Sequence, residues 1–387
     1  MTKEEIRNRI EQLKREKGAV ILAHYYTTKE VQEIADFLGD SLALSVKARD
    51  IEAPIILFAG VNFMAETAKV LSPNKKVLIP VPEAGCSLAE SCEAEALARL
   101  KAQYPDHKVV SYVNTSVGVK ALTDVCCTST NALKVVESIP REQPIIFAPD
   151  RNLGSYIQRV TGRDNMVIWD GACLVHEEFS LEGILRLKTE HPEAKVVVHP
   201  ECKAELVAVA DYVGSTAGIL DYCKESDAET FIVVTESGIL VEMEKRLPSK
   251  RFIPAPTIGS EGGCNECHYM KMVTLENLRD CLRDETPEVV IDEATRAAAE
   301  RSIKNMIANI SGMICDGAKP GCALKVTSGV ATAIFSAYLA MQHSFADSTE
   351  GIVEDDIDRT IHNLTRIGHD GMQVTDDLIL DIMTHKQ

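Results

Sequence analysis

The sequence predicts an α/β protein built from three similar strand–helix units and followed by a helical C-terminal extension. Two observations predict this class. Short β-branched apolar runs alternate with helical stretches along most of the chain, which is typical of parallel sheets with right-handed crossovers. The same succession of elements also occurs three times, and each occurrence ends in a glycine-containing loop that carries a cysteine. With 387 residues, the chain is long enough for several packed cores.

The charge and the apolar pattern exclude several classes of protein. A formal net charge of −17 disfavours nucleic-acid binding, because an acidic surface repels phosphate backbones. The N-terminus, MTKEEIRNRIEQLKREKG, has no apolar segment and is not a signal peptide. The longest apolar run, 329–341, is too short to cross a bilayer. We therefore expect a soluble, cytoplasmic protein without nucleic-acid or membrane partners.

The first unit begins with the apolar run AVILAH, a predicted strand that ends at His24. A helical stretch leads to a small hydroxylated corner, GDS, which contains Ser41. A second strand, a helix and a third strand follow, and the loop EAGCSL then carries Cys86. The loop cysteine comes 45 positions after the corner serine.

The second unit repeats this order. Its first strand ends at Asn114, its corner CTST contains Ser129, and its loop WDGACLVHE carries Cys173, 44 positions after the serine. In the third unit the strand ends at His199, the corner GST contains Ser215 and Thr216, and the loop carries Cys267, 52 positions after Ser215. The extra length is an insertion that carries Cys264.

These matched positions indicate a shared site. In parallel α/β units, residues just past the carboxyl ends of strands line the ligand crevice. Three units around a pseudo-threefold axis would bring the polar strand ends, the hydroxyl corners and the three cysteines together at one centre. The alternative is that the repeats are three independent domains with separate loops.

Twelve cysteines in a cytoplasmic chain are not expected to form a disulfide framework, so most should be small buried hydrophobic residues. Thiols in exposed loops are different, and metal binding is the usual reason for them. Three thiolates without a well-placed fourth ligand disfavour structural zinc. They suit a [4Fe–4S] cluster with one open iron, which acts as a Lewis acid in dehydration chemistry. Helix amino ends at the hydroxyl corners would suit carboxylate or phosphate groups.

Residues of about 18 to 300 resemble the quinolinate synthase family. The resemblance rests on the motifs ILAHYY, VQEIADFLGDSL, GVNFMAETAK, EAGCSLAESC, YVNTS, CTSTNA, PDRNLG, VHPEC, VGSTAGI and CHYMKM. It implies three αβα (Rossmann-like) sandwich domains around a pseudo-threefold axis and a [4Fe–4S] cluster held by three cysteines. It also implies the condensation of iminoaspartate with dihydroxyacetone phosphate to quinolinate, phosphate and water in NAD biosynthesis, with an aspartate-oxidising enzyme as a possible partner.

The resemblance also implies roles for individual residues. The cluster ligands are Cys86, Cys173 and Cys267. The implied substrate-binding residues are His24, Ser41, Tyr112, Val113, Asn114, Ser129, His199, Pro200, Glu201 and Thr216. Tyr26, Glu201 and His24 are the implied catalytic residues that move protons. His176, three residues after Cys173, is either a donor behind the cluster or a surface residue at a helix amino end.

We expect domain boundaries at 1–100, 101–185 and 186–300, with the helical extension over 301–387. The extension resembles the C-terminal end of the L-cysteine desulfidase and iron–sulfur L-serine dehydratase α family, through GMICDGAKPGCALK and IGHDGMQVTDD. In that family this loop contributes to a [4Fe–4S] site, so Cys315 and Cys322 are candidate ligands of a second cluster. The simpler alternative is a helical appendage. Two other functions stay open: an iron–sulfur lyase, and a redox sensor that uses Cys264 with Cys267.

Overall fold

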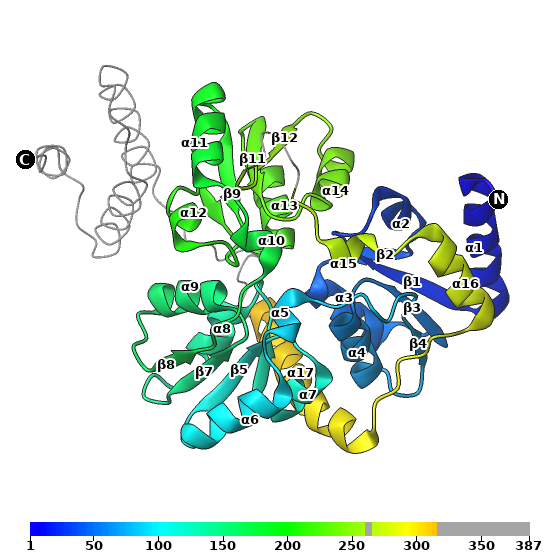
Figure 1. The fold of residues 1–387 in the computed structure, drawn as a ribbon, viewed down its shortest axis with the longest axis horizontal. Helices are drawn as coiled ribbons and strands as arrows, with labels where there is room; N and C mark the ends of the chain where they lie inside the picture. Colours follow the sequence, from blue (N-terminus) through cyan, green and yellow to red (C-terminus); the bar gives the residue numbers. More distant parts are fainter. Residues whose placement is uncertain (260–264, 316–387) are drawn as a thin grey trace, which may run out of the picture.

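The computed structural model describes residues 1–259 and 265–315, and within them it contains three separate four-stranded sheets. All strand pairs inside these sheets are parallel. The strand orders are β2-β1-β3-β4, β6-β5-β7-β8 and β10-β9-β11-β12, which is one order used three times. The three sheets and their helices form three lobes that surround a common centre (Figure 1). The predicted α/β class is therefore confirmed.

The first lobe starts at the N-terminus, where Thr2 caps the first helix through a capping box with Glu5. Its elements are α1 (Lys3–Lys17), β1 (Ala19–His24), α2 (Lys29–Ile34), β2 (Phe37–Gly39), α3 (Ser41–Asp50), β3 (Ile55–Ala59), α4 (Asn62–Leu71), β4 (Lys76–Leu78) and α5 (Ser87–Glu90). β1 and β3 are almost completely buried, because helices cover both faces of the sheet.

The second lobe has the same order of elements. It contains α6 (Ala94–Gln103), β5 (Lys108–Tyr112), α7 (Val117–Leu122), β6 (Val125–Cys127), α8 (Ala132–Glu137), β7 (Ile145–Ala148), α9 (Arg151–Thr161), β8 (Met166–Ile168) and α10 (Leu174–Glu177). The third lobe contains α11 (Leu181–Glu190), β9 (Lys195–Val198), α12 (Ala204–Ala208), β10 (Tyr212–Val213), α13 (Thr216–Glu225), β11 (Thr230–Val234), α14 (Ile239–Arg246), β12 (Arg251–Pro254) and α15 (His268–Lys271).

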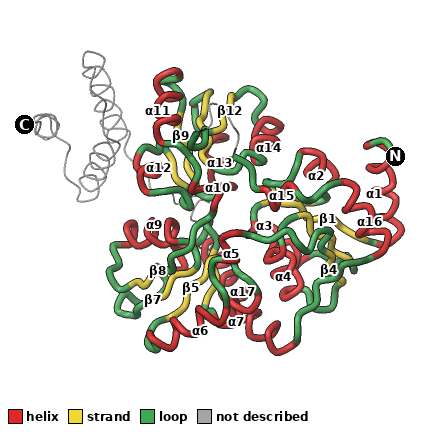
Figure 2. Tube along the Cα trace, viewed as in Figure 1, coloured by secondary structure: helices red, strands yellow, loops and turns green. Residues whose placement is uncertain are grey.

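Each lobe has one strand more than the sequence predicts. The additional strands, β2, β6 and β10, are two or three residues long and stand directly before the hydroxylated corners. Strands this short leave no alternation of apolar and polar residues from which they could be predicted. Figure 2 shows how the strands of each lobe lie between its helices.

After α15 the chain leaves the third lobe and returns to the first two. α16 (Leu275–Asp284) packs against α1, where Leu278 and Leu282 join the core formed with Ile10 and Leu13. α17 (Glu293–Cys315) then packs against α7, β6 and α4. The domain boundaries themselves stay predictions, but residues inside the predicted third unit contribute to the cores of the other two lobes.

α17 also covers an edge strand of the second sheet. β6 is an edge strand of the second sheet, and α17 covers it with the buried side chains of Ala299, Ile303 and Met306. The predicted helices after residue 315 lie outside the residues that the structure describes.

Candidate functional site

A pocket lies between the three lobes, at the carboxyl ends of the parallel strands. It encloses about 650 Å³, including the part that opens to solvent. Its lining residues come from all three lobes: His24, Tyr26, Asp40, Ser41, Leu42, Val61, Phe63, Met64, Gly85, Cys86, Tyr112, Asn114, Thr128, Ser129, Cys173, Val175, His176, His199, Glu201, Thr216, Glu236, Cys267 and Met270.

The structure brings most of the predicted site residues to this pocket. Two predicted substrate-binding residues are not among its lining. Val113 is buried behind the wall, where its backbone N–H donates to the Cys127 carbonyl at 2.8 Å, and Pro200 is buried in the turn after β9. Substrate binding by the predicted residues stays a prediction.

Each of the three predicted cluster cysteines stands directly before a four-residue helix. Cys86 precedes α5, Cys173 precedes α10 and Cys267 precedes α15. In all three turns, the backbone N–H groups of the short helix lie near the cysteine and act to lower the pKa of its thiol. Burial has the opposite and larger effect, and it raises the pKa of the Cys86 thiol to about 12. Buried thiols that share a pocket with backbone donors suit a metal centre, because metal binding removes the proton that burial retains.

The loop that carries Cys173 packs closely against neighbouring backbone at Gly171. Gly171 lies two residues before Cys173, and a Cβ at Gly171 would lie 2.6 Å from the Pro149 carbonyl oxygen and 2.2 Å from the Ser91 hydroxyl. Only glycine fits between these two neighbours without a backbone shift. The loop therefore packs closely against both the strand end after β7 and the turn after α5.

The two strand-end histidines have matching environments. The Nδ1 atom of His24 accepts the Tyr26 backbone N–H at 3.2 Å, and Nδ1 of His199 accepts the Glu201 backbone N–H at 3.3 Å. Burial lowers the pKa of each ring to about 3, so both are neutral near pH 7. Nε2 of His199 lies 3.2 Å from the Ser129 hydroxyl, which joins the third lobe to the second. Each ring thus presents its Nε2 side to the pocket as a hydrogen-bond donor.

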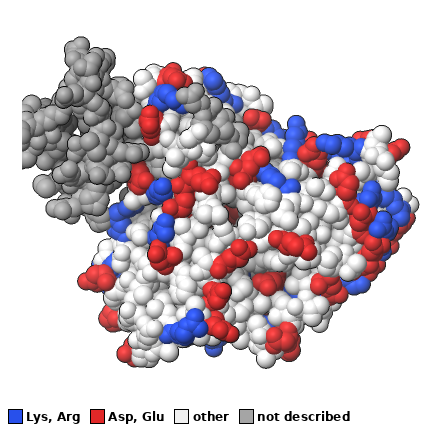
Figure 3. Space-filling view, viewed as in Figure 1, with Lys and Arg blue, Asp and Glu red and all other residues white. Residues whose placement is uncertain are grey.

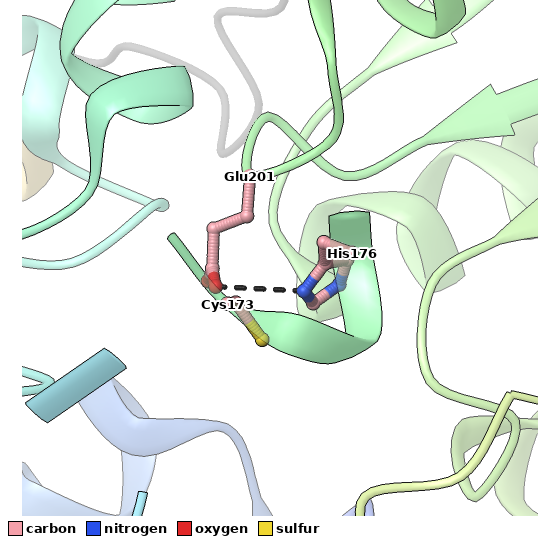
Figure 4. A group of neighbouring side chains, drawn as sticks. All are labelled: Cys173, His176 and Glu201. Carbon is pink, nitrogen blue, oxygen red and sulfur yellow. Dashed lines mark ion pairs between the residues drawn. The ribbon is translucent and has the colours of Figure 1, made fainter. Parts of the chain in front are cut away.

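Glu201 is the centre of a buried acid–base group (Figure 4). The Tyr112 hydroxyl donates to Glu201 Oε1 at 2.6 Å, and His176 Nδ1 lies 3.5 Å from Oε2. Burial alone would raise the pKa of Glu201, but the contact with His176 and the hydrogen bond from the Tyr112 hydroxyl hold it below its usual value. Ligand atoms of Cys173, His176 and Glu201 lie within 4.8 Å of one another, which is a donor set able to hold a metal ion.

Tyr26 connects the first lobe with the third. Its hydroxyl lies 2.7 Å from the Thr216 hydroxyl and 2.9 Å from the Thr235 hydroxyl. Burial raises the pKa of Tyr26 well above 10, so the phenol keeps its proton at neutral pH. Thr216 is the first residue of α13, whose cap is the Ser215 hydroxyl, and Ser41 is the first residue of α3, whose cap is Asp40.

Two residues of the site, Glu236 and Lys271, were not predicted from the sequence. Glu236, directly after Thr235 at the end of β11, is fully buried and lines the pocket. It accepts the Cys267 backbone N–H at 3.0 Å and forms an ion pair with Lys271 at 2.7 Å. The signal in the sequence was a carboxylate two residues after the buried run TFIVV, where a charge needs a partner.

Charges on the described surface are mixed. Over the face drawn in Figure 3, Lys and Arg side chains lie among Asp and Glu and form no continuous basic area within the coloured residues. Among the described residues, no helix combines the length and the apolar composition that spanning a membrane requires. Three predicted thiol positions cannot be placed, because Cys264, the Cys315 side chain and Cys322 lie outside the described part of the structure.

Comparison with known proteins identifies relatives over most of the chain. A family model described as "Quinolinate synthetase A protein" matches residues 8–308. A protein named "Quinolinate synthase" from Microcystis aeruginosa is 55% identical over 298 residues, covering 77% of this chain and 93% of the relative. Proteins with the same name from Trichodesmium erythraeum and Thermosynechococcus vestitus are 52% and 53% identical over 298 residues, and cover 92% and 93% of those relatives.

A second model, described as "Serine dehydratase alpha chain", matches residues 289–381. The two matches overlap from 289 to 308, within and just before α17. Both resemblances predicted from the sequence are confirmed. The overlapping part of α17 packs in the core of the first and second lobes, as described above.

Proposed function

This chain belongs to the quinolinate synthetase A family and is an enzyme of that family, and on this premise we propose that it condenses iminoaspartate with dihydroxyacetone phosphate. The products are quinolinate, phosphate and water, in the synthesis of NAD. The observation that carries this proposal is the meeting of three matched cysteines, two strand-end histidines and a buried glutamate at one pocket. An enzyme needs such a set of acid–base groups, whereas a redox sensor does not.

We propose that Cys86, Cys173 and Cys267 hold a [4Fe–4S] cluster. Support comes from the donor set: three thiols that line one pocket, each directly before a four-residue helix. When bound, a cluster with three protein ligands supplies an open iron that acts as a Lewis acid toward a hydroxyl or carbonyl group. The shared strand order and the matching cysteine positions also support a pseudo-threefold relation between the lobes.

The substrates are small anions, and the polar lining of the pocket offers donors for them. The Ser41 and Thr216 hydroxyls stand at the amino ends of ten-residue helices, where backbone N–H groups favour carboxylate or phosphate. Ser129 and Asn114 line the pocket from the second lobe, and the Nε2 groups of His24 and His199 donate from the other two. Tyr112 holds Glu201 in place through its 2.6 Å hydrogen bond.

The acid–base roles follow from protonation states. Glu201 is ionised and is the strongest candidate base, because the contact with His176 and the hydrogen bond from the Tyr112 hydroxyl favour its carboxylate. Tyr26 is protonated and donates its proton to a substrate atom during cyclisation. His24 is neutral and orients the substrate through Nε2–H. An aspartate-oxidising enzyme would supply the imine substrate, and we expect both to act in the cytoplasm.

The alternative functions have less support. The match to the serine dehydratase α model covers the end of the chain, whereas the pocket lies within the residues matched by the quinolinate synthetase model. The family comparison therefore does not favour a lyase. Release of pyruvate from serine or cysteine by the purified protein would support it.

The test of the proposed function is anaerobic reconstitution with iron and sulfide, followed by an assay for quinolinate from the two substrates. Replacing Cys86, Cys173 or Cys267 by alanine should abolish both the brown absorbance and quinolinate formation. Cys92→Ala is a matched control, because Cys92 is buried at 1% exposure and does not line the pocket. A colourless variant with full activity would contradict the assignment of the cluster.

A further inference from the structure

The wall of the pocket carries acidic groups but no basic side chain. Its lining includes Asp40, Glu201, Glu236 and three thiols, and among the described residues that form it there is no lysine or arginine. The proposed substrates are anions, and a cluster held by three thiolates also carries a net negative charge. Negative charge in a buried site is unfavourable unless positive charge lies nearby. Apart from helix amino ends, any compensating positive charge therefore lies behind the wall.

Two lysines lie close behind the lining residues. Lys271 pairs with Glu236 at 2.7 Å, so its charge is already compensated. Lys120, on α7 of the second lobe, is completely buried. Within the described part of the chain, no carboxylate oxygen lies within 4.0 Å of its Nζ atom. Lys120 is thus a buried basic group without a close ion-pair partner in that part of the structure.

The Nζ atom of Lys120 lies directly behind the pocket wall. It donates to the carbonyl oxygen of Thr115, which follows the lining residue Asn114. It also lies 5.3 Å from the centre of the Phe63 ring, and Phe63 lines the pocket from the first lobe. The ammonium group is therefore adjacent to two segments of the wall, one from each of two lobes.

Helix α17 closes the other side of Lys120. Ser302 of α17 donates to the Lys120 backbone carbonyl at 2.9 Å, and the Cys126 thiol donates to the Ser302 hydroxyl at 3.4 Å. Ser302 and Cys126 are both fully buried. Charges interact more strongly where water is excluded, because the effective dielectric constant is low. The charge of Lys120 therefore acts on the pocket with little screening by solvent.

Neighbouring acidic groups favour the charged form of Lys120. Burial lowers the pKa of Lys120. The Glu66 carboxyl is the largest opposing influence, and the Cys126 and Cys86 thiols also raise this pKa. Because Cys86 is one of the three proposed cluster ligands, the electrostatic effect of Lys120 extends to the position of the cluster.

We propose that Lys120 is an electrostatic positioning residue that offsets the negative charge of a cluster and of anionic substrates in the pocket. This inference rests on the proposed function, and it adds a residue that does not line the pocket. A positive charge behind the wall favours any step that adds negative charge in front of it. It therefore favours reduction of a bound cluster and the binding of anions.

The alternative is that Lys120 only closes the turn before α7 through its hydrogen bond to Thr115. Three substitutions separate charge from hydrogen bonding. Lys120→Gln keeps a donor and loses the charge, Lys120→Met loses both, and Lys120→Arg keeps both. Lys14→Met is the matched control. Lys14 is also buried, at 8% exposure, but it pairs with Asp36 at 2.8 Å and belongs to α1, away from the pocket lining.

The first measurement is the reduction potential of the cluster in the reconstituted full chain, by anaerobic titration followed by visible absorbance. Lys120→Gln and Lys120→Met should make reduction about tenfold less favourable, which is a shift of about 59 mV toward negative potential for one electron. Lys120→Arg should stay within about threefold of the parent, because it keeps the charge. Lys14→Met should lower the stability of the chain and leave the potential unchanged.

The second measurement is the affinity of the same loaded proteins for quinolinate, the proposed anionic product, by calorimetry. This binding requires no turnover. Lys120→Gln and Lys120→Met should weaken it about tenfold, because both lose the positive charge behind the wall. Lys120→Arg should bind within about threefold of the parent, and Lys14→Met should bind as the parent does.

Three results would overturn the inference. A parental value of either quantity in Lys120→Gln would assign Lys120 only the hydrogen bond to Thr115. Equal shifts in Lys14→Met would show a general effect of losing a buried lysine. An arginine variant that binds iron but has the potential of Lys120→Met would exclude charge as the cause. If Lys120→Met does not fold, Lys120→Gln decides.

Failure of the proposed function gives a different result. If the loaded parent forms no quinolinate, the proposed reaction fails, and the reduction potentials of the variants alone decide the role of Lys120. A parent chain that binds no iron after reconstitution would overturn both the cluster assignment and this inference.

Discussion

The ammonium group of Lys271 lies 2.7 Å from Glu236 Oε1 and also donates to the Tyr26 carbonyl oxygen at 2.7 Å. Glu236 in turn accepts the backbone N–H groups of Cys267 at 3.0 Å and Gly238 at 2.7 Å. One buried ion pair therefore connects the third cysteine loop, the end of β11 and the loop of the proposed catalytic tyrosine. This explains how a loop that leaves the third lobe is held at the pocket.

A glycine makes the close contact around this pair possible. A Cβ at Gly238 would lie 2.8 Å from both the Tyr25 carbonyl oxygen and the Tyr26 Cα. The side-chain amide of Gln32 donates to the carbonyl oxygens of Tyr25 and Gly238 at 2.7 and 3.0 Å, across the same junction. The first and third lobes thus meet through backbone atoms at the point where Tyr26 enters the pocket.

Replacing Lys271 by methionine should destabilise this junction. Glu236 is fully buried, and removing its partner leaves a charge that water cannot reach, which costs about 3 kcal/mol in comparable buried pairs. We expect that loss in the free energy of unfolding by urea. We also expect a faster loss of visible absorbance to an iron chelator, because the Cys267 loop loses its anchor.

Lys304→Met is the matched control for this change. Lys304 pairs with Glu300 at 2.7 Å, but its side chain is 64% exposed, so its removal should cost less than about 0.5 kcal/mol. Equal unfolding midpoints for the two variants would show that the buried pair does not stabilise the junction.

The two strand-end histidines predict a dependence of stability on pH. Burial lowers the pKa of His24 and His199 to about 3, below the value of about 6.5 expected in the unfolded chain. The folded state has its full stability with respect to these two histidines above pH 6.5. That stability is lost as the pH falls toward 3, because the unfolded chain binds protons that the folded chain does not. Between pH 7 and pH 5 each histidine should lower the free energy of unfolding by about 2 kcal/mol.

Urea unfolding of the chain before cluster loading, at both pH values, measures this effect. A double variant with glutamine at positions 24 and 199 should lose most of the pH dependence. His191→Gln should retain it, since His191 lies on the surface after α11, away from the pocket. A double variant with the same pH dependence as the parent would contradict the assignment.

Shortening the chain from its C-terminus tests whether the part that matches the quinolinate synthetase model functions without the part that matches the serine dehydratase model. A chain that ends at residue 315 keeps all of α17, and we expect it to form quinolinate and to bind about four irons after reconstitution. A chain that ends at residue 292 loses the buried side chains of Ala299, Ile303, Met306 and Ile307, which should cost roughly 6 kcal/mol of folding free energy.

Iron counts on the full chain complete this experiment. About four irons per chain would indicate that residues after 315 are an appendage, and about eight would indicate a second cluster that involves Cys315 or Cys322. An inactive, correctly folded chain ending at residue 315 would show that the three lobes are not sufficient for the proposed reaction.

The repeated pattern explains why much of the pocket could be predicted from the sequence. His24 and His199 end equivalent strands, and their rings make the same hydrogen bond to the backbone two residues later. Cys86 and Cys173 occupy equivalent turns before short helices. A side chain placed by local backbone geometry recurs at a regular spacing, and that spacing is readable along the chain. Val113 and Pro200 are buried next to these strand ends but are not among the residues that line the pocket.

The sequence by itself determined the α/β class, the three repeats and the positions where loops carry thiols and polar strand ends, because these follow from local periodicity and turn chemistry. Only the tertiary structure decided that Thr235 lies between Tyr26 and His176, and that Lys271 pairs with Glu236. The Tyr26–Thr235 contact joins residues 209 positions apart in sequence. A lone threonine or lysine has no recurring pattern, and its partner exists only after separate lobes pack together and exclude water from the space between them.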